Sequence, residues 1–474
     1  MDPEKQSVER HPSTPKSTST SSGSAATARN QVDCAKQNIS TKDLLLKVIL
    51  PFFFLCLTYH GVIVVTPIFL RKSFGSSDSF IGATTSIGGF GELLSSVPIG
   101  KALAFFGTRR TLHFSLVVIL FAYILFAGSL VQEIVLIANC ILGVGFNSYF
   151  LAQHTFLTGN VPSNFRGKIF AYVGGTWQVS GIVGGLFMVM CAKITGMKLA
   201  FVCMCPFLLI ILFSQIYFFH DKVNERELEV QFSTEQEEAK DNVDSISESD
   251  GEAPAILNKK NALRLRQREI LYDFRKEFVA LGVYCCLLMF VRYSRILMIP
   301  LTGLSLNLSL TEIAVVSSAS FFCASCVFPL SGYIMDRCGR KANSILTMIF
   351  MAMGFLVMYI SIDFYSLLVS GVIIGFGNGL STGLIMALGG DYAPKDKRRG
   401  PFLSLFKLIY GSGQLFGPSM TGIASEYFGV QGGALLALIA CVLGVFWAVI
   451  YIVDNESEVV QDDSHVVHAK SDSQ

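Results

Sequence analysis

The chain has 474 residues, of which 51% are hydrophobic and only 15% are charged. Soluble domains usually carry about a quarter charged residues, so this composition argues against a soluble globular enzyme. The formal net charge of +2 gives no support to nucleic-acid binding, and the 12 cysteines have no metal-ligand spacing with histidine.

Twelve apolar segments are each long enough to cross a bilayer core of ~30 Å, which predicts an all-α polytopic membrane protein with twelve transmembrane helices. The first six segments form an expected N-terminal half over residues 44–219, and the other six form a C-terminal half over residues 278–453. The expected helices lie at 44–70, 79–105, 111–131, 134–158, 168–192, 197–219, 278–302, 311–335, 342–361, 364–389, 401–424 and 430–453.

Polar segments flank and separate these halves. Residues 1–43 are rich in Ser and Thr and are expected to form a disordered tail, and residues 454–474 form a second tail. The linker at 220–277 begins with an acidic stretch, in which three serines each precede an acid by three residues. These serines are either phosphorylation sites of an acid-directed kinase or part of a solvated spacer: Ser245, Ser247 and Ser249. The second part of the linker predicts a basic amphipathic helix on the anionic inner leaflet.

Loop charges predict the orientation. The loops after helices 2, 4, 8 and 10 hold twelve Lys and Arg, against four on the opposite side, so both termini are expected in the cytoplasm. The membrane is either the plasma membrane or an internal, endolysosomal or vacuolar one, since Glu252–Leu257 is similar to an acidic dileucine signal. Asn307 begins a glycosylation sequon that is expected to face the outside or the lumen.

The chain also repeats itself at a fixed distance of about half its length. Gly100 and Gly332 have the same separation as Gly143 and Gly375, and the separation of Pro67 from Pro300 is greater by a single position. A shared register predicts two structurally equivalent halves, a plan of secondary transporters in which the substrate site lies between the halves.

These features resemble the major facilitator superfamily over about residues 44–453. The loop motif Gly332-x-x-x-Asp336-Arg337-x-Gly339-Arg340-Lys341 after helix 8 carries most of the resemblance. The segments GFGNGLSTGLIMALGGDYAP and GSGQLFGP in helices 10 and 11 are similar to the drug and small-metabolite exporter branch. The resemblance implies a monomeric carrier that works by alternating access without a cofactor.

The resemblance also implies a cytoplasmic gate in the second half. Asp336 is expected to meet the N-terminus of helix 11, and Asp391 to pair with Arg340 or Arg337; the alternative is that these charges only set the topology. The first half has Ala104 in place of Asp336, so we expect asymmetric gating. The expected gating residues are Gly332, Asp336, Arg337, Gly339, Arg340 and Asp391.

Polar residues at membrane depth are the candidates for the site, because each is costly to bury without a role or a partner. Glu92 on helix 2 is either a proton carrier or the partner of a cation on helix 7 or 11. Arg292 and Arg295 share a face of helix 7 and either bind an anionic substrate or pair with Glu92. Further candidates, each for the cavity or for helix packing, are His60, Asn147, Gln178, Asn378, Tyr410 and Gln414.

We therefore predict a transporter of a small organic solute, with proton-coupled export as the first hypothesis. Helix 4 carries Asn139 where the exporter family has an arginine linked to proton coupling, so an uncoupled or uptake carrier is the alternative. A carrier-fold receptor or scaffold is the alternative from another class. Expected partners are a small-molecule substrate, protons and the lipid bilayer. No nucleophile–base or metal constellation suggests an enzyme.

Overall fold

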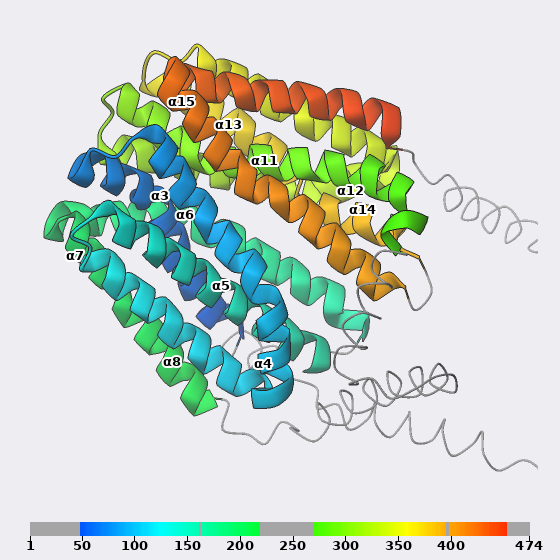
Figure 1. Cartoon of the computed structure of the whole chain (residues 1–474), viewed down its shortest axis with the longest axis horizontal. Coiled ribbons are helices and arrows are strands. Elements are labelled where there is room, and N and C mark those ends of the chain that lie inside the picture. The colour runs from blue at the N-terminus through cyan, green and yellow to red at the C-terminus, as the bar shows by residue number, and fades with distance from the viewer. Residues whose placement is uncertain (1–47, 161–162, 219–269, 395–397, 453–474) are drawn as a thin grey trace, which may run out of the picture.

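The computed structural model describes residues 48–160, 163–218, 270–394 and 398–452, and these ranges contain helices and no strand (Figure 1). The polar tails and most of the linker, including Ser245, Ser247 and Ser249, lie outside the described residues. The first group of elements is α3 (Leu50–Phe69), the short π-helix η2 (Leu70–Phe74), α4 (Asp78–Ala127), α5 (Gln132–Asn160), α6 (Ser163–Thr195), α7 (Met197–Val202) and α8 (Cys205–Phe218). The second group is α11 (Arg275–Ser305), α12 (Leu310–Tyr359), α13 (Phe364–Leu380), α14 (Leu384–Tyr392) and α15 (Arg399–Tyr451).

The described part of the chain has nine helices that are long and apolar enough to cross a membrane. The helices α12 and α15 each contain two spans, and the part of α4 before Gly107 supplies another, so all twelve expected segments are mainly helical where the structure describes them. Turns at residues 203–204 and 381–383 interrupt the sixth and the tenth. Three of the expected loops are single glycines with positive φ inside a long helix, at Gly107 (φ 74°), Gly339 (φ 85°) and Gly429 (φ 74°). A residue with a Cβ rarely adopts this conformation, so glycine allows the chain to reverse direction in very little space.

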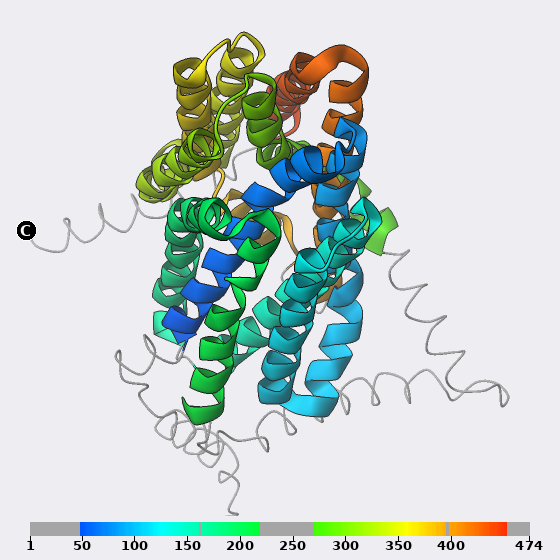
Figure 2. The same ribbon diagram turned by 90° about the vertical axis from the view of Figure 1, so that its left-hand side faces the viewer.

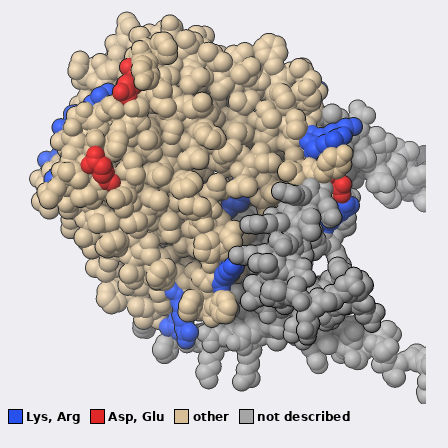
Figure 3. All heavy atoms as spheres, viewed as in Figure 1, with Lys and Arg blue, Asp and Glu red and all other residues tan. Residues whose placement is uncertain are grey.

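The helices form two groups that lie one above the other when the molecule is turned by 90° (Figure 2). Charged side chains on the face in Figure 3 gather mainly toward the two ends of the helices, and the surface between them is largely uncharged. Large apolar side chains are exposed on most of the long helices, for example Phe105, Phe213 and Phe446. An uncharged band flanked by charged ends is the surface expected of a protein that spans a bilayer.

The repeat in the sequence extends to individual contacts. A Cβ on Gly143 would meet the carbonyl of Gly88, and a Cβ on Gly375 would meet the carbonyl of Ser320, with both members of the pair shifted by the same offset. Ser77 caps the N-terminus of α4, and a serine at the equivalent position caps the N-terminus of α12. Each serine hydroxyl accepts a hydrogen bond from the backbone N–H three residues further along the chain. The two groups of helices are thus built on one packing scheme.

The contacts between the two groups gather toward one end, which we call the closed end. There Gly82 of α4 lies against Gly422 of α15, and the backbone N–H of Ser79 donates to Glu426 (3.0 Å). The two groups also meet where α6 packs against α12, and there the hydroxyl of Ser318 donates to the backbone carbonyl of Ile182 (2.6 Å). The closed end is the one that holds the turns at residues 75–77 and at Gly429.

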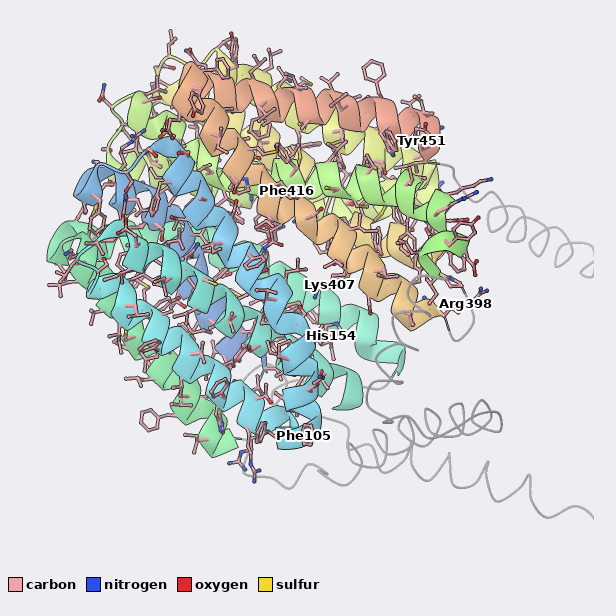
Figure 4. All side chains as sticks on the ribbon, viewed as in Figure 1. Phe105, His154, Arg398, Lys407, Phe416 and Tyr451 are labelled. Carbon is pink, nitrogen blue, oxygen red and sulfur yellow. The ribbon has the colours of Figure 1, made fainter. Side chains whose placement is uncertain are left out.

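Toward the opposite end, polar side chains keep part of their surface accessible. Glu92 and Arg292 are half-buried in mid-span, and Lys407 is exposed although it lies on a membrane-spanning segment. In Figure 4, Lys407 and His154 lie near one another on different groups of helices, and the two side chains interact electrostatically. Polar side chains of both groups of helices thus lie at the interface toward this end.

Candidate functional site

Two sets of side chains, one in each group of helices, occupy equivalent positions in the repeat and differ in chemistry; we call them the first and the second wall. On the first wall the Tyr59 ring stacks on Phe146, with the centroids 4.0 Å apart, and Trp177 packs beside both rings. On the second wall Arg292 takes the position in the repeat that Tyr59 has in the first half. Its Nε donates to Oδ1 of Asn378 (3.0 Å), which takes the position of Phe146. One wall is aromatic and the other is cationic.

Tyr410 completes the second wall, since it takes the position in the repeat that Trp177 has on the first. Its ring packs against Phe406, with the centroids 5.2 Å apart, and it is near enough to Arg292 to interact with it electrostatically. Arg292, Asn378 and Tyr410 were predicted from the sequence as separate candidates, and the structure brings them together.

Glu92 joins the two groups of helices. Its carboxylate accepts a hydrogen bond from the hydroxyl of Tyr59 on α3 (2.8 Å) and another from the side-chain amide of Gln414 on α15 (2.9 Å). Both donors are neutral, and no arginine or lysine of the described chain forms an ion pair with it. The alternative that Glu92 pairs with a cation of helix 7 or 11 stays a prediction: no such ion pair is formed here, although Lys407 on α15 is near enough to Glu92 to interact with it electrostatically.

Asn147 holds the backbone at Glu92 in place. Its amide donates to the backbone carbonyl of Glu92 (2.8 Å) and to the hydroxyls of Ser95 (2.9 Å) and Ser96 (3.2 Å). All of these contacts lie between α4 and α5 within one group of helices. Of its two predicted roles, the contacts of Asn147 fit helix packing.

Arg295 is deeply buried on α11, with 5% of its surface exposed. It donates to the hydroxyl of Ser320 (2.9 Å), and its guanidinium lies over the ring of Phe321, 4.8 Å from the centroid. Neither Arg295 nor Arg292 has a carboxylate partner within the part of the chain that the structure describes. A buried cation without a counter-ion is costly, and a bound anion would offset that cost.

His60 and Gln178 face this region from the first group of helices. Nδ1 of His60 bonds to the carbonyl of Cys56 (2.7 Å), and its ring lies against Trp177 and Phe321, with centroid distances of 4.4 and 4.9 Å. The amide of Gln178 donates across the interface to the hydroxyl of Thr382 (3.4 Å). Both side chains are 2% exposed, so they lie inside the interface.

The predicted gating residues lie at the end opposite the closed end. Nε of Arg340 lies 2.9 Å from Oδ2 of Asp391, so one of the two predicted ion pairs is present, whereas Arg337 lies over the ring of Tyr333 (5.7 Å). Asp336 is exposed and makes no hydrogen bond or ion pair with any described residue. Its predicted contact with the N-terminus of helix 11, which belongs to the same group of helices, is thus not made in this structure.

Three further observations concern the remaining predicted residues. Gly332 has open space around its Cα, and Gly339 provides the positive φ that ends the eighth span. Asn307 is exposed in the turn between α11 and α12 and has a left-handed φ of 56°. Among the described residues no group of three or more His, Cys, Asp or Glu could hold a metal ion.

Sequence reasoning missed the aromatic residues Tyr59, Phe146 and Phe321. A Tyr or Phe in an apolar helix carries no signal by itself, because most such residues pack against other helices or lipid. The repeat offered a signal, since it relates Arg292 to Tyr59 and Asn378 to Phe146.

Comparison with known proteins identifies the type of fold. The family model described as Major Facilitator Superfamily matches residues 48–301 and 280–466. The structure is similar to that of a POT family transporter in complex with a thioalcohol-conjugated peptide, with a TM-score of 0.68 at 12% identity, covering 86% of this chain and 95% of the other. It is also similar to a D-xylose–proton symporter, with a TM-score of 0.67 at 15% identity, covering 88% of this chain and 100% of the other. No curated protein sequence matches the chain.

Proposed function

Because this chain belongs to the major facilitator superfamily, whose members are secondary transporters and not enzymes, we propose that it moves a small organic solute by alternating access, in proton-coupled export. The solute binds between the aromatic wall and the cationic wall, and the two groups of helices rock around it. The chain acts as a monomer within the bilayer and needs no cofactor.

The observation that carries the proposal is the position of Glu92. Its carboxylate accepts from Tyr59 in the same half and from Gln414 in the other half, so it is part of the contact that holds the halves together. Protonation converts one carboxylate oxygen from an acceptor into a donor, which weakens or rearranges these bonds. The protonation of one residue would in this way be coupled to the separation of the two halves.

The charge distribution supports the orientation. Basic residues gather at the end opposite the closed end, which favours a cytoplasmic location for that end and for both termini. The structure then corresponds to an inward-facing state, closed toward the outside or the lumen. A latch at Asp336 that holds the cytoplasmic gate shut is expected to be released in this state, which fits its lack of a partner.

Transport into proteoliposomes tests the proposal. A panel of labelled organic anions and neutral solutes is screened for exchange, and accumulation is then measured under an imposed pH gradient. The variant Glu92→Gln should keep exchange and lose accumulation, whereas Glu133→Gln, which changes an exposed acid on α5, should behave as the wild type. Accumulation that survives full dissipation of the proton gradient would exclude the proton-driven mechanism.

A specific observation favours an uncoupled or uptake carrier as the second candidate. Asn139 replaces the arginine that the exporter branch has on helix 4, and its amide donates to the backbone carbonyl of Thr84 on α4. No charged group stands at that position to respond to a proton. Solute flux that is the same in both directions and independent of pH would favour this candidate.

A further inference from the structure

Glu426 of α15 reaches across the closed end to the N-terminus of α4, which belongs to the other half of the chain. Its carboxylate accepts a hydrogen bond from the backbone N–H of Ser79 (3.0 Å). The hydroxyls of Ser77 and Ser79 also hydrogen-bond to it, and Arg71 is near enough to attract it electrostatically. An acid at the N-terminus of a helix is stabilised by the unpaired N–H groups of the first turn.

The repeat indicates why α4 receives this acid from the other half. In the second half, Ser309 and Glu312 form a capping box at the N-terminus of α12, in which the backbone N–H of Ser309 donates to the Glu312 carboxylate (2.7 Å). The first half has the capping Ser77, but Phe80 takes the position in the repeat that Glu312 has in the second half. The N-terminus of α4 therefore has no capping-box acid of its own, and Glu426 supplies a carboxylate from the other half.

A second contact between the halves lies at the equivalent place with the opposite charge. Lys193, near the end of α6, takes the position in the repeat that Glu426 has on α15. Lys193 is near enough to Glu312, in the first turn of α12, to attract it electrostatically. Where α15 meets α4 and where α6 meets α12, a charged residue of one half thus acts on the start of a helix in the other half.

Two further charged groups lie near Glu426. Asp78 in the first turn of α4 forms an ion pair with Arg71 of η2. Asp78 repels Glu426, whereas Arg71 attracts it. Because Arg71 and Asp78 both belong to the first half and offset one another, the charge of Glu426 acts mainly between the halves.

We infer that Glu426 is a proton-sensitive latch of the closed end, ionised and bonded to α4 while this end is shut. The inference rests on the proposed alternating-access cycle and adds a residue that regulates it. A protonated Glu426 has no negative charge to offer to the N-terminus of α4 or to Arg71, so acid on the outer or luminal face favours opening of this end. The carrier would then open more readily toward a compartment with a higher proton concentration.

Hydrogen–deuterium exchange with mass spectrometry tests the latch in the purified full-length protein without a substrate. Peptides that cover residues 78–90 and 417–428 report opening of the closed end. Exchange is compared at about pH 7 and about pH 4, since an exposed glutamate takes up its proton near the lower value, and labelling times are scaled for the intrinsic exchange rate. In the wild type, both peptides should exchange about two- to fivefold faster at the lower pH, which is the effect of one charge at a helix terminus.

Three variants separate the contributions to this effect. Glu426→Gln removes the charge at nearly constant size, and it should give the faster exchange, by about two- to fivefold, already at about pH 7 and change little on acidification. Lys193→Gln should also speed exchange but keep the pH dependence. Glu133→Gln is the matched control, because Glu133 is an exposed acid in the first turn of α5, where the neighbouring Gln132 bonds to Ser76 at the closed end. It should exchange as the wild type does.

Unchanged exchange in Glu426→Gln, or an equal change in Glu133→Gln, would overturn the inference. Gly82→Ala, whose Cβ would meet the backbone carbonyl of Pro418, distinguishes this failure from failure of the proposed function. If Gly82→Ala speeds exchange at the closed end and Glu426→Gln does not, the latch is wrong but the transport cycle stands. If neither variant nor the pH changes exchange at this end, alternating access fails together with the latch.

Discussion

The substitution Gly82→Ala should shift this protein away from the conformation described here. A Cβ on Gly82 would meet the backbone carbonyl of Pro418 and would lie 3.0 Å from Cα of Gly422, on the other half of the molecule. Both are backbone atoms, so no side-chain rotation relieves the overlap. Overpacking of this kind costs about 1–3 kcal/mol.

This free-energy cost applies only to the conformation in which the closed end is shut. The contact between α4 and α15 exists while the closed end is shut, and it is lost when this end opens. A penalty of about 1–3 kcal/mol then changes the ratio of the two states by about 5- to 150-fold in favour of the open end. Because the variant has an unstrained state available, its thermal stability should stay near that of the wild type.

Hydrogen–deuterium exchange with mass spectrometry measures this shift. Peptides that cover residues 78–90 and 417–428 should exchange faster in Gly82→Ala, and peptides near the opposite end should exchange more slowly. The matched control is Gly100→Ala on the same helix, where an added Cβ has no atom within 4 Å. Unchanged exchange in Gly82→Ala, or the same change in both variants, would refute the reasoning.

Three other predictions follow from the geometry. Gly339→Ala should destabilise the fold by about 1–3 kcal/mol because φ is 85°, whereas Gly332→Ala, at a helical position with open space, should not lower the melting temperature. The ion pair of Arg340 with Asp391 is one-third exposed on each side, so a double-mutant cycle should give a coupling below ~1 kcal/mol; a larger value would mean that the pair is shielded from water. Asp363 caps the N-terminus of α13, and hydrogen bonds from the side chain and then the backbone of Ser366 hold the pKa of Asp363 below its ordinary value. The stability from this cap should therefore be complete above about pH 4 and fall as the pH drops further, and Asp363→Asn should remove that dependence from the melting temperature.

The sequence alone predicted how many membrane spans the chain has and that they form two equivalent halves. A membrane-spanning helix needs a long uninterrupted apolar run, and such a run can be recognised from consecutive residues in the sequence. The offset between the halves, constant to within a single position, then identified equivalent positions, and the structure confirms it at Gly143 and Gly375, whose close contacts differ by the same offset. The loops were harder to predict, since Gly107 alone separates two spans between which the sequence suggested a longer loop.

The partners of the polar residues were decided only by the tertiary structure. The sequence identified Glu92 as the acid at membrane depth and Arg292 as a nearby cation, and electrostatics alone would pair them. The helix positions instead give Glu92 the neutral donors Tyr59 and Gln414, and they leave Arg292 with Asn378. Gln414 lies 322 residues from Glu92, and no local pattern encodes a contact over that distance. Helix packing also pairs Arg340 with Asp391, and it leaves Asp336, which is nearer to Arg340 in the sequence, without a partner among the described residues.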